Sequence, residues 1–128
     1  MKREVIATSD APGAVGPYSQ AIKAGGVVYV SGQLGLVPNT KEFAGETVAE
    51  QTAQVLKNLQ AILEAAGTDL AHVVKTTVFL TDMATFSEMN TVYATFFADD
   101  PPARAAFAVK ALPLGGRVEI EAVAVMPD

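Results

Sequence analysis

The sequence of 128 residues lacks several of the usual carriers of protein chemistry. It has no cysteine, which excludes a disulfide framework, a thiolate nucleophile and a cysteine-ligated zinc site. It has a single histidine, His72, so no second imidazole can join it on a transition metal. We therefore expect no metal site, and we interpret His72 as a surface or boundary residue.

Charge is also scarce, since charged residues make up 18% of the chain against about 25% in an ordinary domain. The nine basic and fourteen acidic residues give a net charge of −5, which argues against a nucleic-acid partner. No apolar run approaches the roughly 18 residues of a membrane span, and no apolar stretch of a secretion signal follows the basic residues of MKREVIATSD. We expect a cytoplasmic protein without a membrane partner.

Hydrophobic residues are abundant, at 50% of the chain. A small globule cannot hide so many apolar side chains by itself, which predicts that part of its surface is buried against copies of itself.

Periodicity predicts one α+β domain over residues 1–128. Apolar stripes favour helices over Val48–Ala66 and from Phe86 to Phe97, and a T-x-x-E capping box precedes each of them. The β-rich segments are 21–24 and 27–30, expected to form a hairpin, 73–80, and 104–110 and 117–126, expected to pair around a turn. This order predicts a mixed β-sheet with two helices packed on one face, and an open second face that serves as an oligomer interface.

Charged residues in the last two segments are candidates for chemistry. Arg104 enters an apolar stretch and needs a partner, because an unpaired buried charge is costly. One interpretation is a structural salt bridge to Glu119 or Glu121, and the other is an anchor for a small anionic ligand. Glu119 and Glu121 share one face of their strand, and one of them could hold a water as a general acid or base. The residues alone leave these alternatives open.

Longer motifs show a family resemblance that covers essentially the whole chain. They include GPYSQAI (16–22), VSGQLG (30–35), VVKTTVFLTDM (73–83) and PARAAFAVKALPLGGRVEIEAVAV (102–125). With these motifs the chain resembles the Rid family of enamine and imine deaminases, also called the YjgF family. The resemblance implies a chorismate-mutase-like fold and a homotrimer with ligand clefts between its subunits.

The resemblance also implies a function, namely cofactor-independent hydrolysis of 2-iminoacids such as 2-iminobutanoate and 2-iminopropanoate to 2-oxoacids and ammonia. In this interpretation Arg104 grips the substrate carboxylate and Glu119 orients the attacking water. The further pocket positions that the family pattern matches are Tyr18, Ser31, Gly32, Asn90, Ala106 and Phe107. Ala106 stands where many members have cysteine and would contribute through its backbone, and Phe107 would reshape the pocket wall.

Two other functions compete with imine hydrolysis. A non-catalytic regulatory protein could use the same cleft to bind a small carboxylate. Some relatives carry the label of ribonuclease, but an acidic chain with one histidine is poorly equipped to cleave RNA.

Overall fold

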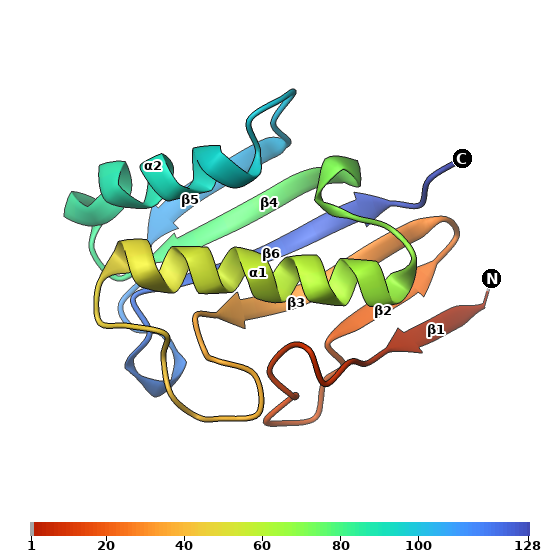
Figure 1. The fold of residues 1–128 in the computed structure, drawn as a ribbon, viewed down its shortest axis with the longest axis horizontal. Helices are drawn as coiled ribbons and strands as arrows, with labels where there is room; N and C mark the ends of the chain where they lie inside the picture. Colours follow the sequence, from red (N-terminus) through yellow and green to blue (C-terminus); the bar gives the residue numbers. More distant parts are fainter. Residues whose placement is uncertain (1) are drawn as a thin grey trace.

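A computed structural model describes residues 2–128, and in it two helices cover one face of a six-stranded sheet (Figure 1). The helices are α1 (Val48–Ala66) and α2 (Phe86–Phe96). The strands are β1 (Arg3–Ile6), β2 (Ala21–Ala24), β3 (Val27–Leu34), β4 (Val73–Leu80), β5 (Ala103–Ala108) and β6 (Val118–Val125). Short 3-10 turns lie at Leu70–His72, Met83–Thr85 and Pro113–Gly115. This arrangement confirms the predicted α+β class and the placement of both helices on one face.

The sheet is mixed, with the strand order β1-β2-β3-β6-β4-β5. Only the pair of β4 and β5, which α2 connects, is parallel among the described strands, and the other pairs are antiparallel. The predicted pairing of the last two strands is therefore wrong, because β4 lies between β5 and β6. The α2 crossover returns β5 to the outer edge of β4, and β6 then enters the sheet between β3 and β4. Both edges of β6 are hydrogen-bonded in this position.

Helix α1 begins and ends as its sequence predicts. The hydroxyl of Thr47 accepts the backbone N–H of Glu50 at 3.1 Å, and the Glu50 carboxylate accepts the N–H of Thr47 at 3.3 Å. Gly67 ends the helix with φ of 94°, in the left-handed region that suits glycine. Between these ends, the stripe of Val55, Leu56, Leu59, Ile62 and Leu63 is completely buried.

The predicted capping box of α2 is wrong. Thr85 makes no side-chain capping bond, and its φ and ψ of −93° and 5° continue the preceding 3-10 turn. The carboxylate of Glu88 instead accepts the backbone N–H of Ala49 at 2.9 Å. Glu88 therefore satisfies a donor in the first turn of α1 and ties the two helices together.

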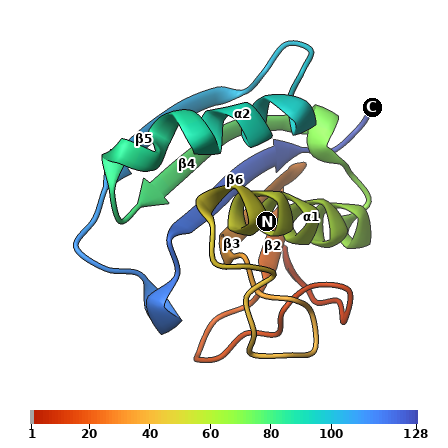
Figure 2. The same cartoon turned by 60° about the vertical axis from the view of Figure 1, so that its left-hand side comes forward.

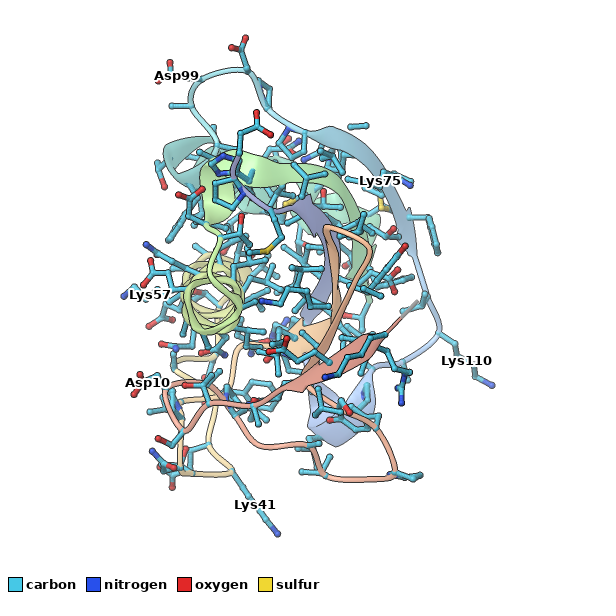
Figure 3. All side chains as sticks on the ribbon, turned by 90° about the vertical axis from the view of Figure 1, so that its right-hand side faces the viewer. Asp10, Lys41, Lys57, Lys75, Asp99 and Lys110 are labelled. Carbon is cyan, nitrogen blue, oxygen red and sulfur yellow. The ribbon has the colours of Figure 1, made fainter. Side chains whose placement is uncertain are left out.

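The two faces of the sheet differ along β6. Val118, Ile120 and Ala124 are completely buried toward the helices, whereas Glu119 and Val123 are half-buried and Glu121 is exposed on the other face. Figure 3 views the molecule from the end: Lys57 projects from the outer side of α1, while Lys75 and Lys110 lie at the side of the sheet that no helix covers. The second face of the sheet is thus open within one chain.

Two further features concern membranes and metal ions. Neither helix in residues 2–128 combines the length and apolar character needed to cross a membrane. Among these residues, no group of three or more histidine and acidic side chains surrounds a possible metal position.

His72 is a partly exposed boundary residue, as predicted, and its Nδ1 lies 2.6 Å from a carboxylate oxygen of Asp69. This contact lowers the pKa of Asp69, chiefly through the hydrogen bond with His72.

Candidate active site

Glu119 lies on the open face of β6, close against the backbone of β3. A Cβ atom added to Gly32 would stand only 2.9 Å from the carboxyl carbon of Glu119. That separation is shorter than any ordinary contact between carbon atoms. Gly32 is therefore required for the observed position of the Glu119 carboxylate. The family resemblance assigned Gly32 to the ligand pocket, and in the structure the Glu119 side chain lies against its backbone.

A β-bulge shapes the backbone beside Glu119. The pairing of β3 with β6 shifts between Val30, which faces Ala122, and Gln33, which faces Ile120, so Ser31 and Gly32 together face one residue. Bulges of this kind redirect side chains and are frequent next to active sites. The Ser31 hydroxyl donates to the carbonyl oxygen of Ser19 at 2.6 Å. Its proton is thereby occupied, so its oxygen can serve a ligand as an acceptor.

Burial raises the pKa of the Glu119 carboxyl above its ordinary value, and the negative charge of Glu121 raises it further. Both causes disfavour the ionised form. A carboxylate with a raised pKa holds a proton more strongly and is a better general base once it is ionised.

A cavity of about 370 Å³ opens beside Glu119, at the end of β3 and the start of β6. Tyr18, Ser31, Gly32 and Glu119 all line it, so the structure brings these four candidate residues to one place. The phenol oxygen of Tyr18 accepts the backbone N–H of Val15 at 3.3 Å, so the phenol proton is available as a donor. Loops from three parts of the chain supply the other walls, and Figure 2 shows these loops below the sheet.

Arg104 lies on the opposite, helix-covered face of the sheet. In the strand register it stands beside Thr76, which pairs with the buried Ala122, whereas Glu119 pairs with Phe79. The predicted salt bridge from Arg104 to Glu119 or Glu121 is therefore wrong within one chain. Alternation along the strands directs the arginine and these carboxylates to different faces.

The guanidinium of Arg104 has partners of its own on α2. Its Nη1 donates to the side-chain oxygen of Asn90 at 2.7 Å. Its central carbon lies 4.8 Å from the ring centroid of Tyr93 and 5.4 Å from that of Phe86, within the range of cation–π attraction. The hydroxyl of Tyr93 shares a buried hydrogen bond of 2.7 Å with Thr76. Helix α2 thus holds the arginine in one orientation.

Sequence reasoning assigned Phe86 and Tyr93 only to the apolar stripe of the second helix. Their contact with Arg104 could have been predicted from the spacing of Phe86, Asn90 and Tyr93 at i, i+4 and i+7. These positions share one face of a helix. A polar residue between two aromatic ones on such a face suits an arginine, because the guanidinium both donates hydrogen bonds and stacks on rings.

The two remaining predicted residues lie on different faces. Ala106 packs partly buried on the helix side of β5. Phe107 projects on the open side, where it is 46% exposed and meets Phe79 edge to face, with ring centroids 5.2 Å apart. The structure thus distributes the predicted residues over two groups, a helix-side group of Asn90, Arg104 and Ala106 and an open-side group of Tyr18, Ser31, Gly32, Phe107 and Glu119.

The fold and this geometry define an α+β protein of two layers, with a carboxylate-lined cavity and a separately held arginine. The family model described as Endoribonuclease L-PSP matches residues 8–126, and the chain belongs to this family. The RutC family protein y4sK of Sinorhizobium fredii is 61% identical over 94% of this chain and 95% of that protein. The 2-iminobutanoate/2-iminopropanoate deaminase of Mus musculus is 53% identical over 96% and 91%.

A solved structure is similar to this chain over nearly its whole length. The crystal structure of Escherichia coli TdcF with bound serine has a TM-score of 0.92 and 39% identity, and the match covers 97% of this chain and 99% of that one. The predicted resemblance to the Rid family is confirmed by these comparisons.

Proposed function

We propose that the protein is a 2-iminoacid deaminase, which hydrolyses 2-iminobutanoate, 2-iminopropanoate and similar imines to 2-oxoacids and ammonia. The observation that carries the proposal is the Glu119 carboxylate, which lies beside a cavity with its pKa raised by burial. Relatives at about half identity over nearly the full length, such as the mouse protein, bear the name of this activity.

In the proposed reaction the ionised Glu119 holds a water molecule and takes a proton from it as its oxygen bonds to the imine carbon. The electron pair of the C=N bond moves to nitrogen. The nitrogen then leaves as ammonia after receiving a proton, and the remaining hydroxyl loses its proton to give the 2-oxoacid. A protonated imine is already electrophilic, so this sequence needs only an oriented water and a base.

Arg104 supplies the proposed anchor for the substrate carboxylate. Asn90 accepts from Nη1, and other N–H donors of the guanidinium fork can bind the two carboxylate oxygens. The rings of Tyr93 and Phe86 keep the fork in place. The anchor is thereby oriented before substrate arrives, and this lowers the entropic cost of binding.

In this mechanism a small 2-iminoacid must contact Arg104 and Glu119 at once. In one chain, however, these residues lie on opposite faces of the sheet. We therefore propose that each site forms between copies of the chain in a homotrimer, with Arg104 from one copy and Glu119 from its neighbour. The open face of the sheet supports this assembly, because the large side chains of Tyr29 and Phe107 project from it about half exposed, at 52% and 46%.

A mixing experiment tests the chemistry and the shared site together. The variants Arg104→Ala and Glu119→Gln should each lose at least about 100-fold in kcat/KM on 2-iminoacids. When the two are unfolded, mixed in equal amounts and refolded, random assembly should restore about one quarter of the sites, because a shared site needs one intact residue from each neighbour. A mixture that remains as inactive as its components would contradict the shared site.

A second candidate is a regulatory protein that binds a small carboxylate without turning it over. The bound serine in the related TdcF structure favours this alternative. Glu119→Gln distinguishes the two, since the amide keeps the size of the side chain but cannot accept a proton. A deaminase should lose turnover in this variant and keep affinity for a 2-oxoacid, whereas a binding protein shows no turnover in the wild type.

A further inference from the structure

The lining of the cavity beside Glu119 contains two kinds of residue. The lining residues with polar side chains are Tyr18, Ser31, Gln33 and Glu119. The apolar lining comes from the surrounding loops and the end of β3, and consists of Pro12, Val15, Leu34, Leu36, Pro113 and Leu114. Glu119 is the charged residue of the lining. A ligand reacting at Glu119 therefore has apolar side chains within the same cavity.

Leu114 is the unusual member of this set. Its φ and ψ are 58° and 16°, a left-handed conformation that is rarely adopted by leucine. The next residue, Gly115, also has a positive φ, of 78°, but glycine adopts it without strain. Leu114 is 59% exposed, so burial in the core of the chain does not offset its strain. What this position provides is an apolar side chain at the cavity, and strained residues of this kind cluster at ligand sites.

We propose that Leu114 is a specificity-determining residue that favours 2-iminoacids with apolar side chains larger than methyl or ethyl. The inference rests on the proposed imine hydrolysis. With the carboxylate held by Arg104 and the imine carbon at Glu119, the remaining substituent on that carbon is the substrate side chain. Because the loops around Glu119 line the cavity with apolar groups, this substituent gains most when it is apolar and long enough to reach Leu114.

The expected size of the preference follows from the methylene groups buried. One methylene in an apolar pocket changes kcat/KM by roughly tenfold or more. The imine of leucine has three carbons more in its side chain than the imine of alanine. We therefore expect kcat/KM for 4-methyl-2-iminopentanoate to exceed that for 2-iminopropanoate by at least about tenfold.

The test uses both imines, each generated in solution by an amino-acid oxidase from leucine or alanine. The measured quantity is the fraction of imine that the protein hydrolyses before semicarbazide traps it. Leu114→Gly removes the side chain and suits the positive φ, and Leu114→Asn replaces it with a polar group that tolerates the same backbone. Both variants should lose about tenfold on the leucine imine and less than about threefold on the alanine imine.

Met83→Ala is the matched control, because Met83 is also an exposed apolar residue, at 42%, but does not line the cavity. It should leave the ratio between the two substrates unchanged. If the wild type hydrolyses both imines without preference for the larger one, the role of Leu114 is wrong but the proposed function stands. Equal losses on both substrates in the Leu114 variants would lead to the same conclusion. A wild type that hydrolyses neither imine would overturn the proposed function and this inference with it.

Discussion

The two faces of the sheet hold their functional residues in different ways. On the helix-covered face, Arg104 is fixed by partners of the same chain, namely the amide of Asn90 and the rings of Tyr93 and Phe86. On the open face, Glu119 stands beside a cavity, and Gly32 is the residue that makes room for it. A face buried within the chain can orient a group in advance, whereas an open face leaves the group to be completed by a ligand or a neighbouring copy.

The largest expected effect is a loss of stability when a buried side chain on the helix-covered face is truncated, compared with the same change on the open face. Leu59→Ala, in the completely buried stripe of α1, should lower the free energy of unfolding by about 2–5 kcal/mol. Tyr29→Ala, on the open face, should cost less than about 1 kcal/mol in protein dilute enough to be monomeric. Urea denaturation followed by circular dichroism measures both. Equal losses in dilute protein would mean that the open face is already packed within one chain.

The next effect concerns the contact between Gly32 and Glu119. Gly32→Ala should displace the carboxylate and lower kcat/KM on 2-iminoacids by about 10–100-fold, because small misplacements of a catalytic group are costly. Gly13→Ala is the matched control: Gly13 lines the same cavity, but a Cβ there meets nothing within 4 Å. This control should change kcat/KM by less than about threefold. Similar losses in the two variants would show that the contact with Glu119 is unimportant.

The smallest effect is a shift of the pH profile. The proposed base must be ionised, so kcat/KM should fall as pH drops through the raised pKa of Glu119. Glu121→Gln removes one cause of that raised pKa and should move the acidic limb to lower pH. The shift should be small and should shrink further in high salt, because Glu121 is exposed and its charge is screened. An acidic limb that moves upward in Glu121→Gln would contradict the assignment of Glu119.

The raised pKa of Glu119 also has a consequence for folding. A carboxyl whose pKa is higher in the folded than in the unfolded chain stabilises the fold while it is protonated, and this contribution is lost as pH rises through the folded pKa. The base that serves the proposed reaction therefore lowers the stability of the fold at the pH where it acts.

Local features of the fold could be predicted from the sequence. The boundaries of α1 follow from Thr47, Glu50 and Gly67, whose capping contacts involve residues close in the chain. The strand over Val73–Leu80 was likewise predicted with its observed boundaries, because its β-branched residues act locally.

Distant contacts could not be predicted. Glu88 has the spacing of a capping residue for its own helix, yet it binds Ala49, which is 39 residues away. The last two strands follow one another like a hairpin, but β4 separates them. The separation of Arg104 from Glu119 and Glu121 was missed for the same reason, because residues can be assigned to opposite faces of a sheet only once the strand register is known.

The place of β6 in the sheet also bears on how the protein is made. Among the described strands β6 is the last in the chain, yet it lies between β3 and β4. The part of the sheet made of β1, β2 and β3 therefore cannot join the part made of β4 and β5 until β6 has been synthesised. Until the ribosome has released residues 118–125, an edge of β3 and an edge of β4 remain unpaired, and apolar surface beneath α1 stays open. A nascent chain in this state is prone to aggregate. Translation must therefore run almost to the end of this domain before folding can protect it.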